Sequence, residues 1–565
     1  MTFDLVIRNG TVVDGSGLDG FRTDVGVVGD RIAAIGRIRD RGTTDLDADG
    51  LVVTPGFIDG HTHMDAQMFW DPQGSFSCFH GVTSVVMGNC GFTLAPASAT
   101  QAPLVVRNLE RAEDISPEAM AAGIEWGWTT FAEYLDVIDA LPMGINYAAN
   151  IGHSALRTFV MGERAFEQTA DADDLAAMER ELREALRAGA YGFTTSRTKH
   201  HMTSDDRPVA SRIASPDELA FLVEVVGDES GGFFQYVEDP APADEQASRD
   251  AWWLDLAVRS GVPFALAANN PATLARIDAI AAAGGRAFGV THPRGIGALL
   301  SFRSQLPFDH APEWQEFRAR PEAEQLRALR DPEVRARLVW AAHHRPRGEG
   351  FGGETRPADF DLMSVLDRPV PPNPTVNQLA AERGVDPVEV MLDVALEHDY
   401  DVFFRQPFSP FDVTVVEEAL RHSRSVMGFS DAGAHVSQMA DYSLPTYLLA
   451  HLVRDRQTFS LAEAVAMMTF KPARAWGFHD RGLVREGLVA DLNVLDPDTV
   501  SPSLPSLVRD LPGGAPRVQQ LSTGIAATVV AGAVVVRDGV HTGATPGRLI
   551  RGGNRPSRPL LSRRA

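Results

Sequence analysis

Eight short apolar segments, separated by helical patterns or longer connections, constrain the fold of this chain more than any other feature. A clear intervening helix is DADDLAAMERELREALRAG, in which Asp174 is a candidate N-cap and Gly189 a candidate end. Alternating strands and helices are typical of a parallel α/β fold, and eight such units predict a (β/α)8 barrel. The segments cover residues 56–63, 82–90, 144–153, 191–196, 232–239, 263–270, 286–294 and 425–435.

Both ends of the chain carry β patterns. FDLVIRNGTVVDGSG predicts a hairpin around Asn9-Gly10, and RGLVREGLVADLNVLD and IAATVVAGAVVVRDG predict strands near the C-terminus. We therefore predict a small β-sandwich domain built from both termini, residues 1–55 and 480–545, around a barrel of residues 56–479.

Two further segments stand apart from this pattern. Residues 305–400 are too long for one loop and are helical in pattern, so they predict a helical insertion between the last two barrel strands. Residues 546–565 contain six arginines and predict a basic flexible tail.

Composition bounds the partners and the compartment. The net charge of −23 argues against DNA or an anionic membrane as the main partner, so we expect no nucleic acid and no membrane. The N-terminus lacks a signal-peptide pattern, and no apolar run is long enough to span a membrane. The two cysteines, Cys78 and Cys90, exclude a disulfide framework and favour the cytoplasm. The acidic charge is compatible with a homo-oligomer without arguing for one.

Four candidate metal ligands follow predicted strands. His61 and His63 are two residues apart on a strand end, so their side chains are expected to point the same way, toward the barrel axis. Cys90 lies between glycines, where it is either a zinc ligand or a small buried thiol. Asp431 is either a ligand that also moves a proton or the N-cap of the next helix.

Other polar residues at strand ends are candidate substrate contacts. Histidine and arginine side chains could receive a substrate anion, although structural roles for the histidines are equally compatible with the pattern. The segment TTSRTKHHMTSDDRPVAS adds further basic groups at the predicted mouth of the barrel, or forms a solvated loop. The candidates are His153, Arg157, Arg197, His200, His201, Tyr236, His292, Arg294 and His435.

The motifs TPGFIDGHTHMD, GVTSVVMGNCGFTLAP, NIGHSALR, GFSDAGAH and LVREGLVADLNVLD together resemble the D-aminoacylase (N-acyl-D-amino-acid deacylase) branch of the amidohydrolase superfamily. The resemblance spans roughly residues 3–540 and is weakest over 200–400. It implies a metal-bearing barrel with a β-sandwich built from both termini.

The resemblance also implies roles for single residues. His61 and His63 match the paired ligands of the first strand, and Cys90 matches a cysteine that bridges metals in this branch. Asp431 matches the aspartate of the last strand, which is a metal ligand and the catalytic acid and base. His153 matches a histidine in a Gly-His-x-x-Leu-Arg element.

Two ligands implied by the resemblance have no counterpart here. The family places histidines at the ends of the fifth and sixth strands, where this chain has Tyr236 and either Ala268 or Asn269. Glu238 and Asp239 are candidate replacements. We expect one zinc per chain, although another divalent metal fits the same donors.

Three functions are compatible with these residues. The leading hypothesis is a zinc-dependent hydrolase of a linear amide, such as an N-acylated D-amino acid, in which Asp431 transfers the proton. A hydrolase of a cyclic amide, imide or lactone is the second, because one scaffold serves many substrates. The third is a metal-poor relative without enzymatic activity, which the missing histidines favour and the retained ligands oppose.

Overall fold

The computed structural model describes residues 2–229, 231–345, 356–409 and 412–553. Its parallel strands lie in the predicted segments, with the third segment divided between β8 and β9. One parallel sheet has three strands: β6 (Phe57–Asp59), β7 (Val82–Met87) and β8 (Asn146–Ala149). The other runs in the order β17-β13-β12-β11-β10-β9. Its strands are β9 (Ile151–Gly152), β10 (Phe193–Ser196), β11 (Phe234–Val237), β12 (Pro263–Ala267), β13 (Arg286–Thr291) and β17 (Ser425–Met427).

The two parallel sheets adjoin each other at both ends. Tyr191 donates its backbone N–H to Ala149 (2.7 Å), and Gly60 donates to Gly428 (3.1 Å). One buried apolar cluster draws side chains from both sheets: Ile58, Val86, Ala148, Phe233, Ala265, Phe288, Val290 and Val426. Trp476, at the end of α17 (Phe470–Trp476), packs into the same cluster. The strands therefore surround a common core, although their hydrogen bonds form two sheets and no single closed one.

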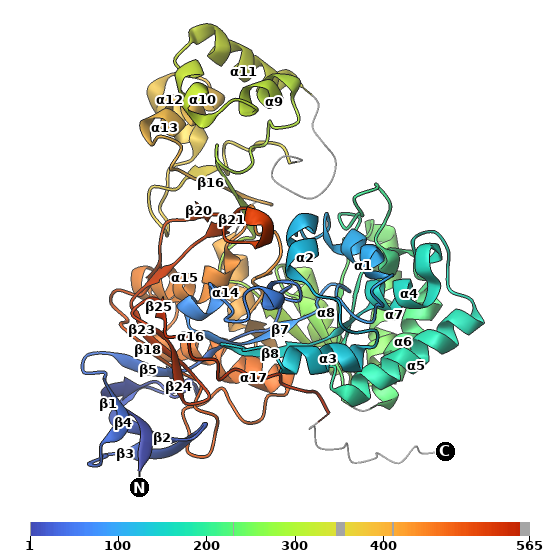
Figure 1. Cartoon of the computed structure of the whole chain (residues 1–565), viewed down its shortest axis with the longest axis vertical. Coiled ribbons are helices and arrows are strands. Elements are labelled where there is room, and N and C mark those ends of the chain that lie inside the picture. Colours follow the sequence, from blue (N-terminus) through green and yellow to red (C-terminus); the bar gives the residue numbers. More distant parts are fainter. Residues whose placement is uncertain (1, 230, 346–355, 410–411, 554–565) are drawn as a thin grey trace.

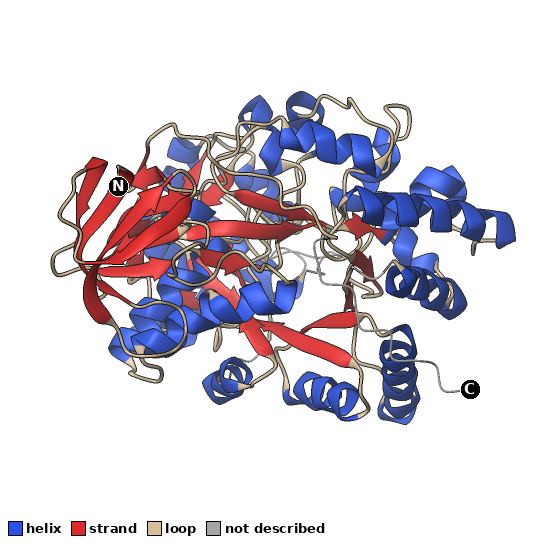
Figure 2. Cartoon of the chain, turned by 90° about the horizontal axis from the view of Figure 1, so that it is seen from below, coloured by secondary structure: helices blue, strands red, loops and turns tan. Residues whose placement is uncertain are grey.

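Helices cover the outer side of these strands (Figure 2). They include α3 (Phe131–Asp139), α4 (His153–Met161), α5 (Ala172–Ala188), α6 (Pro216–Asp228), α7 (Ala243–Ser260), α8 (Pro271–Ala282), α14 (Val413–Arg421) and α16 (Leu461–Met468). In α5 the N-cap is Asp171 and not the predicted Asp174. Asp171 accepts from the N–H of Asp174 while Asp174 accepts from the N–H of Asp171, which is a capping box.

The two ends of the chain share one sheet of nine strands, in the order β25-β24-β23-β18-β5-β1-β2-β3 with β4 also paired to β1. Strand β18 joins the termini because it pairs antiparallel with both β5 and β23. The predicted sandwich is not confirmed. The strands are β1 (Phe3–Val12), β2 (Phe21–Val28), β3 (Arg31–Gly36), β4 (Gly42–Asp47), β5 (Val52–Pro55), β18 (Leu492–Leu495), β23 (Ile525–Val530), β24 (Ala533–Arg537) and β25 (Val540–His541).

The predicted hairpin at Asn9-Gly10 is wrong, because β1 continues through both residues. Asn9 has a φ of 61°, and the register between β1 and β2 shifts between Ile7 and Gly10. A single left-handed residue inside a strand is typical of a β-bulge, which bends the strand without reversing it.

Residues 297–345 and 356–407 form a lobe between β13 and β17 with a hydrophobic core of its own, which includes Trp314, Phe317 and Leu338. Figure 1 shows this lobe projecting from the rest of the molecule. A small antiparallel sheet joins it to the parallel strands: β14 (Gly297–Leu300), β15 (Ser364–Val365) and β16 (Phe404–Pro407). The range 305–400 contains α9 (Pro312–Arg318), α10 (Glu322–Ala328), α11 (Pro332–His344), α12 (Val376–Arg383) and α13 (Pro387–Glu397).

The C-terminal segment differs from the predicted flexible tail over residues 546–553. Ile550 donates its N–H to Tyr147 (2.7 Å), and Arg551 donates to Asp136 (2.8 Å). These bonds fix the segment against β8 and α3. The rest of that tail, residues 554–565, lies outside the described residues. Among the described helices, none has the length and apolar character needed to cross a bilayer.

Candidate metal centre

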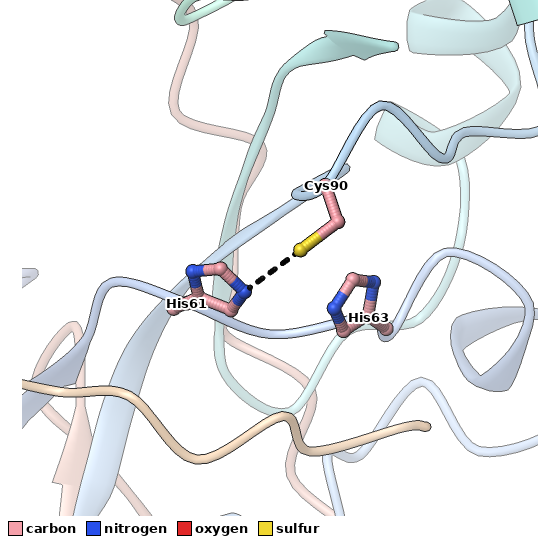
Figure 3. A group of neighbouring side chains, drawn as sticks. All are labelled: His61, His63 and Cys90. Atoms are coloured by element: carbon pink, nitrogen blue, oxygen red, sulfur yellow. Dashed lines mark hydrogen bonds between the residues drawn. The ribbon is translucent and has the colours of Figure 1, made fainter. Parts of the chain in front are cut away.

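Three predicted ligands meet at the carboxyl ends of β6 and β7. Suitable donor atoms of His61, His63 and Cys90 all lie within 4.8 Å of one another. Their side chains converge from two neighbouring loops (Figure 3). His61 and His63 are each 2% exposed and Cys90 is 6% exposed. Three buried groups of metal-binding type therefore share one small volume.

Asp431 joins this group from the loop after β17. Its Oδ1 lies 3.3 Å from His61 Nε2 and 3.5 Å from His63 Nε2, and His61 Nε2 lies 3.5 Å from Cys90 Sγ. Bonds of about 2.0 Å to nitrogen or oxygen and about 2.3 Å to sulfur place tetrahedral zinc ligands about 3.3–3.5 Å apart. His61, His63 and Cys90 thus have the chemistry and the spacing of a divalent metal site, and Asp431 lies at ligand spacing from its two imidazoles.

The backbone brings the ligands this close by adopting left-handed conformations. Cys90 has a φ of 55° and Asp431 a φ of 53°. The backbone N–H of Cys90 donates to Gln235 Oε1 of β11 at 2.8 Å. Gly433, with a φ of 96°, passes so close to His63 that an added Cβ would lie 2.4 Å from the His63 carbonyl oxygen.

A buried carboxylate that the sequence patterns did not reveal also faces the centre. Glu113 lies in the turn between α1 (Ala102–Leu109) and α2 (Pro117–Gly123) and is 1% exposed. Its Oε2 lies 3.6 Å from His63 Nε2 and 3.5 Å from His435 Nε2. Glu113 follows no strand, and several charged residues surround it in the sequence, so neither position nor periodicity marked it.

Burial and neighbouring charges lower the pKa of some of these groups and raise the pKa of others. Burial lowers the pKa of His61 to about 3 and raises the pKa of Cys90 to about 11. Burial also acts to raise the pKa of Asp431, but the hydrogen bond from His63 and the nearby imidazoles outweigh it and bring the pKa to about 2. At neutral pH, Asp431 is therefore ionised, and His61 is a neutral imidazole that can donate a lone pair to a metal. The thiol of Cys90 needs a nearby cation to ionise at this pH.

Two predicted substrate contacts, His153 and Arg157, bind a buried glutamate. His153 uses Nδ1 for Thr195 Oγ1 and Nε2 for Glu218 Oε1, both at 2.9 Å. Arg157 forms an ion pair with the same carboxylate. Their polar atoms therefore hold α4, β10 and α6 together.

Arg294 is similarly engaged, whereas His292 borders a cavity. Arg294 donates to Asp441 (2.6 Å) and to Ser443 (3.0 Å). His292 lines a cavity of about 450 Å³ together with Asn269 and Phe408. The His292 ring lies 6.0 Å from the ring of Phe429, which stacks on His61 at 4.0 Å. Phe429 thus neighbours both a residue of the cavity wall, His292, and a residue of the metal cluster, His61.

The basic residues in the segment after β10 differ in their burial and in their partners. His201 is buried, with Nδ1 2.7 Å from Ser196 Oγ and its ring 5.1 Å from that of Phe92. Its pKa falls to about 3 because of burial and of neighbouring His435 and His63. His200 is partly exposed, with Nε2 3.9 Å from Asp239 Oδ1. Arg197 donates to the carbonyl of Ala214.

Tyr236 and the candidate replacement ligands face other partners. The Tyr236 ring stacks on Trp253 of α7 at 3.8 Å, and its hydroxyl accepts from Arg276 of α8. Glu238 accepts from Trp253 Nε1 (3.0 Å) and Arg276, while Asp239 accepts from Thr198 (2.8 Å). Side chains alternate along a strand, so it is Gln235, next to Tyr236, that faces the cluster.

The chain belongs to the amidohydrolase family, whose model matches residues 46–536. It is 28% identical to a D-aminoacylase of Alcaligenes xylosoxydans xylosoxydans, over 97% of each chain. It is 29% identical to an N-acyl-D-glutamate deacylase of the same organism, over 88% of each chain.

Solved structures of similar proteins align with this chain over nearly its whole length. The N-acyl-D-glutamate deacylase from Bordetella bronchiseptica, in complex with zinc and a phosphonate mimic of the tetrahedral intermediate, is 25% identical with a TM-score of 0.64. The match covers 98% of this chain and 100% of that one. A D-aminoacylase has a TM-score of 0.63 at 26% identity, over 97% and 100% of the two chains. Its binuclear metal centre is activated by one metal and attenuated by a second.

Proposed function

We propose that this protein is a metal-dependent hydrolase that cleaves a carbon–nitrogen amide bond, with an N-acylated D-amino acid as its substrate. The observation that carries the proposal is the convergence of His61, His63 and Cys90, with Asp431 at ligand spacing from both histidines. Relatives that act as N-acyl-D-amino-acid deacylases align with nearly the full chain, which supports this substrate class.

The proposed scaffold is a (β/α)8 barrel of residues 56–479, with residues 1–55 and 480–545 forming the accompanying β domain. The apolar cluster shared by both parallel sheets supports closure. The ligands follow the carboxyl ends of β6, β7 and β17, the face where barrel enzymes carry their chemistry.

We assign one zinc ion to the centre. The resemblance would put histidines on the fifth and sixth strands, where this chain has Gln235, bound to the backbone of Cys90, and Asn269, which lines the cavity beside His292. Neither is an imidazole. A related D-aminoacylase that needs only one metal for activation supports a single-metal enzyme.

When bound, the zinc would polarise the scissile carbonyl and lower the pKa of the attacking water. The Asp431 carboxylate, ionised because of its imidazole neighbours, accepts the proton from that water. The protonated Asp431 then delivers the proton to the leaving nitrogen. His61 is held by Phe429 on one ring face, which fixes the direction of its Nε2.

The substrate would occupy the cavity beside His292, where Asn269 adds a polar group and Phe408 an apolar wall. Among the predicted contacts, His292 lines this space directly, while His201 and His435 lie deeper, near His63 and Glu113. We propose these three histidines as the residues that orient the substrate.

A substrate panel tests the proposal. Zinc-loaded protein would be offered N-acetyl-D-amino acids, their L enantiomers, hydantoins and lactones, with amine or acid release followed. The proposal expects hydrolysis of D substrates well above L substrates. Hydrolysis confined to cyclic substrates, or none by fully loaded protein, would overturn it.

A further inference from the structure

We propose that Glu113 is a further ligand of the metal centre, so that this chain surrounds its metal with two carboxylates, two imidazoles and one thiolate. The inference rests on the proposed metal-dependent function and deepens it. It assigns a ligand that comes from a turn between two helices, whereas the other ligands follow strands.

A short distance places Glu113 beside one ligand of the cluster, His63. Its Oε2 lies 3.6 Å from His63 Nε2, close to the 3.5 Å that separates Asp431 Oδ1 from the same nitrogen. Both values are near the separation of about 3.3 Å expected for two nitrogen or oxygen ligands of one zinc ion. Glu113 and Asp431 thus stand in the same relation to His63.

The environment of Glu113 favours a cation next to its carboxylate. The carboxylate is 1% exposed, and its Oε1 has no hydrogen-bond partner among the described residues. Its ion pairs in the described structure are with the imidazoles of His63 and His435, and none is with a lysine or arginine. A buried carboxylate with so few partners is costly, and metal coordination would offset that cost.

The fold also holds Glu113 in place through the loop that carries Asp431. The backbone N–H of His435 donates to the Glu113 carbonyl at 2.6 Å. The next residue, Asp114, accepts from Gln438 Nε2 at 3.2 Å and from Ser437 Oγ. These hydrogen bonds tie the turn to the loop, which is the support that a ligand from a non-strand segment requires.

Cobalt substitution tests the assignment independently of turnover. The Co²⁺ form of the wild type should show the weak visible absorption of an ion with five protein donors and a water, and Glu113→Gln should strengthen this absorption as the ion loses one ligand. Because even indirect partners of a metal site are worth about 10–100-fold in affinity, Glu113→Gln should weaken Co²⁺ binding by at least about tenfold. Glu118→Gln, an exposed glutamate in the same segment, is the control and should change neither.

An unchanged spectrum in a folded Glu113→Gln variant would overturn this inference while leaving the hydrolase proposal intact. Absence of metal binding by the wild type would overturn both. If Glu113→Gln fails to fold, X-ray absorption of the wild-type zinc form decides instead. Six ligands, one of them sulfur, support the inference, and five or fewer contradict it, because four protein donors and the attacking water already give five.

Discussion

The side-chain oxygen of Gln235 accepts a hydrogen bond of 2.8 Å from the backbone N–H of Cys90. Gln235 lies on β11, the strand where the family resemblance implies a histidine ligand. Here the strand contributes an amide that holds the left-handed backbone of Cys90, whose φ is 55°. The fifth strand thus positions the backbone of Cys90, a candidate metal ligand.

Replacing Gln235 with alanine should therefore loosen the thiolate without removing a ligand. We expect the zinc affinity of Gln235→Ala to fall about 10–100-fold, because indirect partners of metal ligands typically contribute that much. Isothermal titration of metal-free protein measures it. Tyr236→Phe, on the same strand but directed at α7 and α8, is the control and should bind zinc like the wild type. Equal affinity in Gln235→Ala and wild type would contradict the positioning role.

Asp431 should be essential for turnover and much less important for holding the metal. In Asp431→Ala, His61, His63 and Cys90 remain within 4.8 Å of one another, so zinc should largely stay bound. Turnover should fall by about 10²–10⁴-fold, the usual contribution of a proton-transfer group. Parallel measurements of zinc content and kcat check both parts. Wild-type turnover in the zinc-loaded variant would rule out the proposed proton transfer.

Gly433 should tolerate no side chain, because of both its conformation and its contact with His63. Its φ is 96°, and an added Cβ would lie 2.4 Å from the His63 carbonyl oxygen. Gly433→Ala should lower the free energy of unfolding by more than about 2 kcal/mol and also weaken zinc binding. Gly384→Ala is the matched control, since its φ is 67° and nothing lies within 4 Å of the added Cβ. The control should cost only about 1 kcal/mol and leave zinc binding unchanged.

Acid should weaken the buried pairing of Glu218 with His153 and Arg157. Burial alone would raise the pKa of Glu218, but these partners outweigh it and lower the pKa to about 2 from 4.5. Because the folded pKa is the lower one, the stabilisation is complete above pH 4.5 and is lost as the pH falls toward 2. The full effect is about 3 kcal/mol.

The comparison with Glu218→Gln isolates this contribution from other carboxylates. Urea denaturation at several pH values should give a wild-type advantage that is largest at neutral pH and shrinks steadily below pH 4.5. A difference in unfolding free energy that stays constant from pH 6 to pH 3 would show that Glu218 does not titrate as described.

The candidate ligands that follow strands could be predicted from the sequence, because the ends of parallel strands lie in predictable positions. His61, His63, Cys90 and Asp431 each follow an apolar segment, and the carboxyl ends of parallel strands share one edge. Glu113 follows no strand and approaches the centre only because its turn pairs with the loop at His435. Such a long-range contact leaves no local pattern.

At two other places the structure differs from the sequence-based prediction in the placement of one or two residues. On β11 the alternation of side chains decides whether Gln235 or Tyr236 faces inward, and a shift of one residue reverses the answer. At Asn9-Gly10 the same dipeptide serves a hairpin or a bulge, and the pairing of β1 with β2 and β5 decides which forms. Both outcomes depend on pairing with other strands, which the local sequence pattern does not show.

We propose that one divalent metal, held by residues that follow β6, β7 and β17, makes this chain an amide hydrolase. Elemental analysis of the purified protein, beside a His61→Ala/His63→Ala variant, tests it most directly. We expect about one zinc per wild-type chain and almost none in the variant. This stoichiometry corresponds to a single site of four or more protein donors. A wild type without bound metal, or a double variant that retains its full metal content, would contradict it.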